Sequence, residues 1–333
     1  MAARLRPDAI LLLATGHWTA GLLRGAVATG LFSHIARGNA TVAQLAAAVA
    51  GDAGGIRVTL NALTALGLLR KEGESYRLRP LAETYLVEDS PSYLGDLITA
   101  GCGSAYHFRV FEHYEHVIAQ GRALDLDVWV DDKEYAASLA TGLFGINRPI
   151  AEKVCDDLGW KGEHDEAWGL LDLGRSAGAF GLTALLRLTR AKLTLLDHPH
   201  LTAVARRFGE RLGVAGRLQE RPGDCRREPL GGPYDAVFMS QLLHTLSETE
   251  QQQLLGACRT ALRPGGHLVV VEFLPDEGRR GNMGALLFEA MVYGFTGRTF
   301  HTPLSLRRLL EANGFLVHHL KTEGPGGYAI AQA

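Results

Sequence analysis

A glycine-rich turn between a mostly apolar run and a helical segment places the strongest constraint on how this chain folds. Residues 170–173 predict a short buried strand, and Gly174 and Gly178 predict a tight turn into a helix. Such a turn gathers backbone N–H groups and the positive end of a helix, which can bind the anionic or polar part of a nucleotide-like cofactor. The spacing Asp172-x-Gly174-x-Ser176-x-Gly178 is one residue tighter than the dinucleotide-binding fingerprint, and a turn that only connects strand to helix is the alternative.

Charge and cysteine usage argue against several classes of protein. The 333 residues carry a formal net charge of −2, so neither nucleic acid nor an anionic membrane surface is an expected partner. The length allows two domains, each with a hydrophobic core. The cysteines are scattered along the sequence without Cys-x-x-Cys pairs, which indicates a reducing compartment and argues against a disulfide framework or a zinc site. They are Cys102, Cys155, Cys225 and Cys258.

The N-terminal apolar run over 9–32 is interrupted by His17 and Arg24. The sequence contains no stretch of about 20 uncharged apolar residues, so no membrane span is expected. A signal peptide is not expected either, and we predict a cytoplasmic protein.

A polar break over 158–167 divides the sequence. Mostly helical patterns precede it. Strand-like and helix-like segments alternate after it, which predicts an α/β domain with a mostly parallel sheet and helices on both faces. We therefore expect a mainly helical domain over 1–160 and a cofactor-binding, catalytic domain over 161–333.

The first domain contains a pattern typical of a winged helix. Thr41 and Gln44 predict a capping box at the start of a helix over 42–50. A second helix over 54–69 and two short strands over 69–78 follow. The predicted apolar side of the second helix holds Val58, Leu60, Leu63 and Leu66.

DNA binding is one function of such a module, but the second helix has Arg57 as its only basic residue. A major-groove reader needs more phosphate and base contacts than this helix offers, so packing and dimerisation are favoured. The apolar segments over 9–32 and 54–69, predicted as long helices, exceed what a small module can cover. We therefore predict a twofold homodimer through this half of the chain.

The second domain is predicted strand by strand. The expected strands cover 170–173, 192–196, 217–220, 234–239, 267–272, 315–321 and 328–332. The expected helices cover 178–190, 200–212, 247–262 and 303–313. The connection between the last two strands is too short for a parallel crossover, so that pair must be antiparallel.

Polar residues follow the ends of these strands, where open α/β sheets bind their ligands. Asp197 ends the second strand, where an acid can accept hydrogen bonds from both ribose hydroxyls of a nucleotide. The alternative is that each acid only caps a following helix. The residues expected at this edge are Asp172, Gly174, Asp197, Asp224, Ser240, His244 and Glu272.

Short motifs over nearly the whole chain carry a family resemblance: Gly30-Leu-Phe32, 63–69, Tyr76-Arg-Leu78, 171–180, 196–199, Pro222-Gly-Asp224, Leu243-His244, 262–266, Val271-Glu272 and 312–315. The chain resembles the class I S-adenosylmethionine-dependent methyltransferases. Within them it is similar to the O-methyltransferases of small aromatic molecules from plant phenolic and bacterial natural-product pathways.

The resemblance implies a Rossmann-like methyltransferase sheet, an N-terminal winged-helix dimerisation domain that also lines the substrate site, and a homodimer. It implies S-adenosylmethionine as cofactor, a small-molecule acceptor and no metal. His244 matches the family's catalytic histidine, and Glu272 matches the acid beside it. The implied cofactor-binding residues are Asp172, Gly174, Arg175, Ser176, Gly178, Asp197, Asp224, Cys225 and Ser240.

The chain departs from the family pattern around the implied cofactor site. Arg175 and Ser176 stand where the family usually has glycine, Cys225 where it has Phe or Met, and Thr245 where it has Asp. The Cβ of Ser176 restricts the backbone, so the turn is expected to lie further from the cofactor. Arg175 can pair with the methionine carboxylate of the cofactor, or it can face water.

Proton transfer defines the expected mechanism. A phenol, with an ordinary pKa of about 10, is mostly protonated at neutral pH. A neutral imidazole within about 3 Å can take its proton as the oxygen attacks the methyl group, which contributes roughly 10²–10⁴-fold. We assign this role to His244, with Glu272 fixing the tautomer. A histidine that only satisfies a helix N-terminus is the alternative.

Other function classes remain open at this point. A decarboxylase, hydroxylase or pericyclic catalyst could use the same scaffold without methyl transfer, and methylation at carbon could replace methylation at oxygen. Among further candidate groups, a pocket wall or helix face is favoured over zinc ligation for His107, His113 and His116. A core stripe and an acceptor-pocket lining are the two interpretations of Met283, Phe288, Met291 and Tyr293. The acceptor side also has Asn147 and Arg148 as candidate lining residues.

Overall fold

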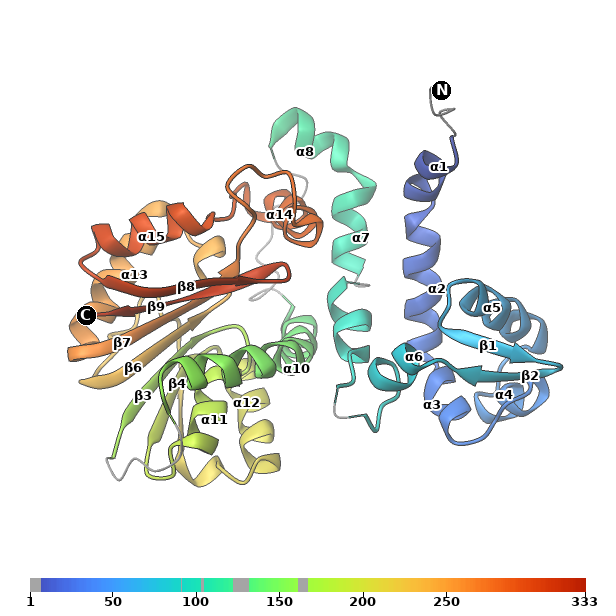
Figure 1. Cartoon of the computed structure of the whole chain (residues 1–333), viewed down its shortest axis with the longest axis horizontal. Coiled ribbons are helices and arrows are strands. Elements are labelled where there is room, and N and C mark those ends of the chain that lie inside the picture. The colour runs from blue at the N-terminus through green and yellow to red at the C-terminus, as the bar shows by residue number, and fades with distance from the viewer. Residues whose placement is uncertain (1–6, 91, 103–104, 122–131, 161–166) are drawn as a thin grey trace. The chain divides into compact units, whose positions relative to one another are not determined.

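The computed structural model describes residues 7–90, 92–102, 105–121, 132–160 and 167–333. The chain divides into two compact units, Met1–His107 and Phe108–Ala333 (Figure 1). This division falls earlier than the predicted boundary between 160 and 161, because helix α10 (Lys133–Asp157) packs on α11 (Ala179–Arg187) and α12 (Pro199–Arg211). Part of the predicted polar break, 161–166, lies outside the described residues.

The first unit is mainly helical with one hairpin, as predicted. Its elements are α1 (Asp8–Ala14), α2 (Gly16–Ala28), α3 (Leu31–Ala36), α4 (Val42–Ala48), α5 (Ala53–Ala65), β1 (Leu69–Glu72), β2 (Ser75–Leu78), α6 (Pro80–Tyr85) and the π-helix η1 (Leu97–Cys102). The prediction of one long helix over 9–32 is wrong. The segment breaks at Thr15 and again at Gly30, whose φ of 69° lies in the left-handed region that favours glycine.

The predicted capping box and hairpin are confirmed. The Thr41 hydroxyl accepts from the N–H of Gln44, and the Gln44 side chain accepts from the N–H of Thr41. The two strands of the hairpin pair antiparallel. The buried side of α5 differs from the prediction, because Val58 and Leu66 are 65% and 45% exposed. The side chains of α5 that reach the core are Ile56, Leu60 and Leu63.

Helices α1 and α2 carry exposed apolar side chains, among them Ile10, Leu12, Leu13 and Trp18. Within the described part of the chain, no single helix is long and apolar enough to cross a membrane. By length and composition alone, α1 and α2 together meet that criterion as a pair bent by 48°.

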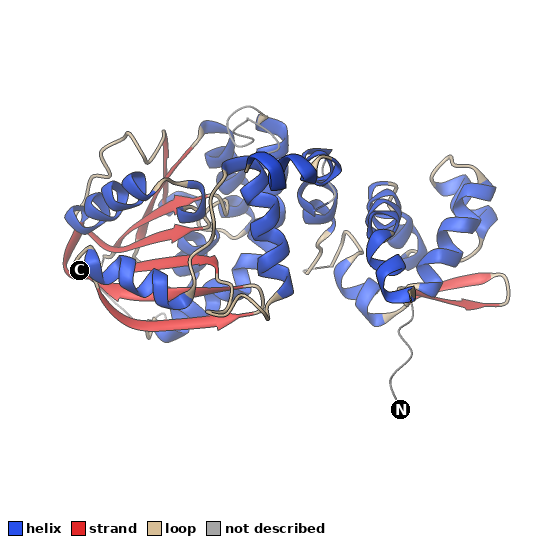
Figure 2. Ribbon diagram, turned by 90° about the horizontal axis from the view of Figure 1, so that it is seen from above, coloured by secondary structure: helices blue, strands red, loops and turns tan. Residues whose placement is uncertain are grey.

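The second unit is built on a seven-stranded sheet in the order β5-β4-β3-β6-β7-β9-β8. Its strands are drawn in red in Figure 2. The strands are β3 (Gly169–Gly174), β4 (Lys192–Asp197), β5 (Leu218–Pro222), β6 (Tyr234–Ser240), β7 (Leu262–Phe273), β8 (Leu316–Glu323) and β9 (Gly326–Gln332). Neighbours from β5 to β7 are parallel, and β9 runs antiparallel to both β7 and β8. The predicted antiparallel last pair is therefore confirmed.

Helices cover both faces of this sheet. The remaining elements are α8 (Tyr114–Gln120), η2 (Ala215–Arg217), η3 (Leu243–Thr245), α13 (Glu248–Ala261), α14 (Met283–Thr296), α15 (Pro303–Ala312) and α7 (Ala105–Glu112), which spans the division between the units. Helices α10, α11 and α12 pack on one face, and α13 and α15 pack on the other (Figure 1). Successive strand residues alternate between the two cores, as Val237 and Phe238 do. Burial on both faces explains the nearly continuous apolar runs of the sequence.

Candidate active site

The carboxyl ends of β3, β4 and β5 border a small cleft. Its lining is Gly174, Arg175, Leu196, Asp197, His198, Gly223, Asp224, Cys225, Arg226 and Leu242. The cleft brings together five predicted cofactor-binding residues, which are Gly174, Arg175, Asp197, Asp224 and Cys225. The other predicted cofactor-binding residues are buried and do not line the cleft. These are Asp172, Ser176, Gly178 and Ser240.

Gly174 lets the chain turn while β3 and β6 stay paired. Its φ is 128°, a conformation that favours glycine. Gly174 stands opposite Ser240 in the β3–β6 register, and the N–H of Arg175 donates to the Ser240 carbonyl over 3.3 Å. A Cβ at position 174 would clash with that same carbonyl oxygen. The glycine is therefore required by the close approach of the two strands.

Ser176 turns its hydroxyl into a buried polar network. The Ser176 oxygen accepts from Asn147 and from the Ser240 hydroxyl, each over 3.0 Å. The Gln241 amide in turn donates to the Asn147 oxygen over 3.3 Å. All four side chains are buried. The network ties helix α10 to the turn after β3, so Asn147, which sequence analysis placed on the acceptor side, supports the cofactor turn from behind.

Asp172 holds the start of helix α11. One carboxylate oxygen accepts from the N–H of Gly181 over 2.7 Å. Burial raises the pKa of Asp172 to about 7, against the lowering effect of that backbone hydrogen bond. This contact is the helix-capping role that the sequence left open for the acids at strand ends.

Asp197 presents an unsatisfied acceptor at the cleft. Its Oδ1 accepts from the N–H of His198 over 2.8 Å, whereas the buried Oδ2 has no hydrogen-bond partner among the described residues. Burial raises the pKa of Asp197 to about 8, while the His198 hydrogen bond and the positive charge of Arg175 act in the opposite direction. A buried carboxyl oxygen of this kind fits a ribose hydroxyl, so the residues present fit a nucleoside-containing cofactor.

Asp224 and Cys225 complete the β5 side of the cleft. Burial alone would raise the pKa of Asp224, but hydrogen bonds from the backbone and side chain of Arg226 outweigh it and lower the pKa. Burial raises the pKa of the Cys225 thiol to about 12, so it remains an uncharged lining group.

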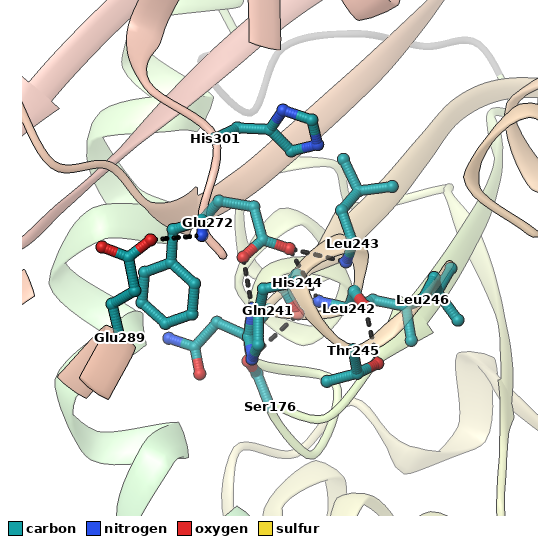
Figure 3. Close-up of polar contacts among 12 residues, drawn as sticks. Ser176, Gln241, Leu242, Leu243, His244, Thr245, Leu246, Glu272, Glu289 and His301 are labelled. Carbon is teal, nitrogen blue, oxygen red and sulfur yellow. Dashed lines mark hydrogen bonds and ion pairs between the residues drawn. The ribbon is translucent and has the colours of Figure 1, made fainter. Parts of the chain in front are cut away.

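His244 and Glu272 meet at the ends of β6 and β7. The His244 Nδ1 and the Glu272 Oε2 are 2.6 Å apart, and both side chains are buried (Figure 3). The other carboxylate oxygen accepts from the N–H groups of Leu242 and Leu243 over 2.8 and 2.7 Å. Glu272 therefore fixes both the turn that carries His244 and the orientation of its ring. With Nδ1 donating to the carboxylate, the lone pair lies on Nε2.

Three phenylalanine rings surround the imidazole of His244. The Phe300 ring centroid lies 5.1 Å from that of the imidazole, and those of Phe273 and Phe288 lie 6.3 Å from it. Phe288 was one of the candidates on the helix after the fifth strand. Of the others, Met291 is buried and Met283 is 71% exposed.

Sequence reasoning missed Phe300 and its supports. A local signal was available nearby, since Thr302 and Ser305 form a capping box that begins α15 and so locates the preceding loop. No local pattern places that loop beside His244, because the contact joins residues far apart in the chain.

The three histidines of the aromatic segment do not form a metal centre. Burial lowers the pKa of His107 to about 4. His113 and His116 are half exposed, and their rings stack with centroids 5.7 Å apart. No group of three or more His, Cys, Asp or Glu side chains that could hold a metal ion occurs among the residues the structure describes.

The sheet order, the glycine turn at β3 and the acid at the end of β4 define a methyltransferase fold. The chain matches the O-methyltransferase domain over residues 115–316 and the O-methyltransferase dimerisation domain over residues 11–88. Because the first match covers more than half of its length, the chain belongs to the O-methyltransferase family. It is an enzyme that methylates small molecules with S-adenosylmethionine as methyl donor.

Individual relatives agree with this assignment. The chain is 29% identical to 3-hydroxy-5-methyl-1-naphthoate 3-O-methyltransferase of Streptomyces sahachiroi, over 97% of this chain and 94% of the relative. It is 25% identical to the tetracenomycin polyketide synthesis 8-O-methyl transferase TcmO of Streptomyces glaucescens, over 98% and 96%. The crystal structure of human N-acetylserotonin methyltransferase in complex with SAM superposes with a TM-score of 0.84 at 22% identity, covering 100% of this chain and 99% of that one. That likeness establishes the fold.

Proposed function

We propose that this enzyme methylates a hydroxyl oxygen of a small, flat aromatic molecule, with His244 as general base. The observation that carries the proposal is the contact between His244 and Glu272. His244 follows closely in sequence after Leu242, which lines the cofactor cleft. In this proposal, His244 accepts the proton beside the cleft that would hold the methyl donor. S-adenosylmethionine supplies an electrophilic methyl group when it is bound.

The cleft residues divide the work of holding the cofactor. The free Oδ2 of Asp197 would accept from a ribose hydroxyl, and the turn at Gly174 and Arg175 would face the amino-acid part. Asp224 and Cys225 would border the adenine. Asp172, Ser176, Gly178 and Ser240 would act from the layer beneath, where they shape the turn.

The His244–Glu272 pair accepts one proton, that of the acceptor hydroxyl. The Nε2 of His244 takes the proton of the acceptor hydroxyl as its oxygen attacks, and Glu272 stabilises the imidazolium that results. Phe288, which is partly exposed, offers apolar ring surface beside the imidazole, which suits a flat aromatic acceptor, and the buried Phe300 packs against the imidazole. A base of this kind is needed for a hydroxyl acceptor that is protonated at neutral pH.

A panel of hydroxylated aromatics tests the reaction type. The panel should include 3-hydroxy-5-methyl-1-naphthoate, because the Streptomyces sahachiroi relative is named for it. Incubation with methyl-labelled S-adenosylmethionine is expected to give a methoxy carbon by NMR, with one demethylated cofactor formed per product. A new carbon–carbon bond, or product formed without consumption of the cofactor, would contradict O-methylation.

We also infer that the enzyme works as a twofold homodimer in the cytoplasm. The match to the dimerisation domain supports the dimer, and the exposed apolar side chains of α1 and α2 supply surface for it. Leu12→Asp combined with Trp18→Asp is expected to yield a monomer in sedimentation, with Val58→Asp as a comparison on a second exposed face. A wild-type monomer at micromolar concentration would refute the dimer.

A further inference from the structure

The loop between α14 and α15 passes beside the base, and three of its residues are anchored to different elements. The Arg298 guanidinium donates to the carbonyl of Thr245 over 2.9 Å. The His301 Nε2 lies 3.0 Å from the side-chain oxygen of Gln251, whose amide donates to the carbonyls at the turn that carries His244. Phe300 lies between these two anchors. We call residues 298–301 the strap.

Phe300 is held through its own backbone by the ion pair of Arg279 and Glu289, in which Glu289 is buried and Arg279 is exposed. Its N–H donates to Glu289 Oε1 over 2.7 Å, and its carbonyl accepts from Arg279 Nη2 over 2.8 Å. Arg279 and Glu289 pair with each other through both carboxylate oxygens. The Arg279–Glu289 ion pair thus provides hydrogen-bond partners for both the backbone N–H and the carbonyl of Phe300.

Two more observations show that this arrangement is specific. Glu289 and Phe300 are only 8% and 3% exposed, so an unpaired carboxylate would be costly there. Arg279 has a φ of 48°, in the left-handed region that residues with a side chain rarely adopt. The backbone at Arg279 therefore accepts strain in the conformation that brings its guanidinium to Glu289 and Phe300.

We propose that Glu289 is a positioning residue, which acts on His244 through Phe300. The proposal rests on the proposed function, because it needs His244 to be the base. Glu272 orients the imidazole through Nδ1, and Glu289 orients the Phe300 ring that packs against the imidazole 5.1 Å away. Loss of the Glu289 charge loosens the backbone of Phe300 within the strap, so the ring shifts and the imidazole gains freedom to tilt. A displacement of about 1 Å in a reacting group can cost on the order of 10²-fold in rate.

A double-mutant cycle in turnover tests the proposal. The variants are Glu289→Gln, Phe300→Ala and their combination, assayed with the fastest acceptor of the hydroxylated aromatic panel, 3-hydroxy-5-methyl-1-naphthoate included. Each single change is expected to lower kcat by about 10-fold to 10²-fold. The KM for S-adenosylmethionine should stay near the wild-type value. Because Glu289 acts through the ring, adding Glu289→Gln to Phe300→Ala should lower kcat no further.

The controls separate positioning from a merely structural role. Glu311→Gln removes the charge of an exposed, helix-spaced pair with Arg307 and should leave kcat and the melting temperature unchanged. Arg279→Lys keeps the positive charge and should restore part of the kcat that Arg279→Gln loses. If Glu289→Gln does not fold, the Arg279 variants take its place in the cycle.

Three results would overturn the proposal. The first is a Glu289→Gln enzyme with wild-type kcat. The second is a double variant whose loss is the product of the two single losses, because independent effects multiply. The third is a His244→Ala enzyme with normal turnover, which would remove the proposed function as well. A His244→Ala loss together with a normal Glu289→Gln enzyme would reject the positioning role alone.

Discussion

The two sides of the active-site edge differ in how completely their polar groups are satisfied. On the β4–β5 side, Asp197 keeps a buried oxygen without a partner among the described residues, and its pKa is raised to about 8. On the β6–β7 side, both oxygens of Glu272 are hydrogen-bonded and His244 Nδ1 is held. The first side retains hydrogen-bonding capacity for a ligand, whereas the second is organised before any ligand arrives. Mutations on the two sides should therefore affect different kinetic constants.

The largest effect should come from the base. His244→Ala is expected to lower turnover by about 10²–10⁴-fold, because the change removes the group proposed to take the acceptor proton. The dissociation constant for S-adenosylmethionine should hardly change. Turnover and calorimetric titration of the variant would measure the two effects, with His318→Ala, an exposed histidine on β8, as control. Near-normal turnover would show that the acceptor needs no base and would favour methylation at carbon.

Glu272→Gln should have a smaller but substantial effect. Its amide NH₂ cannot accept a hydrogen bond, so either the imidazole or the turn loses its partner. We expect turnover to fall by less than the roughly 10²–10⁴-fold of the base deletion. The melting temperature should also fall, which His244→Ala need not cause. A Glu272→Gln enzyme with full turnover would contradict this view, since it would show that the Glu272 hydrogen bonds on the β6–β7 side are not needed for turnover. Glu323→Gln on β8 is the control.

Asp197→Ala should affect binding and leave the chemistry intact. Without its acceptor, the ribose hydroxyls lose a partner, which weakens cofactor binding by about 1–3 kcal/mol. From a wild-type dissociation constant of about one micromolar, this change is roughly tenfold for each 1.4 kcal/mol. Titration with S-adenosylmethionine would measure the loss, and Asp156→Ala at the end of α10 is the control. Unchanged affinity for S-adenosylmethionine would reject the assignment of Asp197 to ribose binding. A lowered kcat at saturating cofactor would show that the β4–β5 side also affects the chemical step.

The smallest effect concerns the pH dependence of stability. Burial raises the pKa of Asp197 to about 8, from an ordinary value of about 3.9. The folded state then binds more protons than the unfolded state between these values, so the free energy of unfolding falls as pH rises from about 4 to about 8. Asp197→Asn cannot ionise. Its melting temperature relative to the wild type should therefore rise across this window.

Asp276→Asn provides the matched comparison for that measurement. Backbone hydrogen bonds from Gly281 and Arg280 lower the pKa of Asp276. Its contribution to stability is present above the ordinary pKa and is lost only as pH falls further, so the Asp276→Asn difference should be flat above about pH 4. An Asp197→Asn difference that is equally flat would show that Asp197 is not buried as a neutral acid.

The catalytic unit could be predicted closely because its signals are local or periodic. The buried strands are apolar runs that end in turn residues, and the last antiparallel pair follows from the short connection around Gly324. The N-terminal unit was harder. A helix pattern shows which side is apolar but cannot show whether that side is covered, and Val58 and Leu66 of the predicted apolar side are exposed.

The candidate site was predictable where it depends on strand ends, and not where it depends on contacts between distant segments. Carboxyl ends of parallel strands meet at one edge, which brought Asp197 and Glu272 to their places. The link from Asn147 to Ser176, and the hold of Glu289 on Phe300, join side chains from separate helices and loops. No spacing rule relates such residues.

Glu272 is needed for the structure of the turn as well as for the reaction. Its one carboxylate serves the turn through two backbone N–H groups and the base through Nδ1. A descendant enzyme that abandoned proton abstraction could discard the histidine at once, but discarding the acid would leave two buried N–H groups without an acceptor. In sequences of this fold, the acid at this position is therefore a marker of architecture. Only the histidine four residues after the end of β6 is a marker of chemistry.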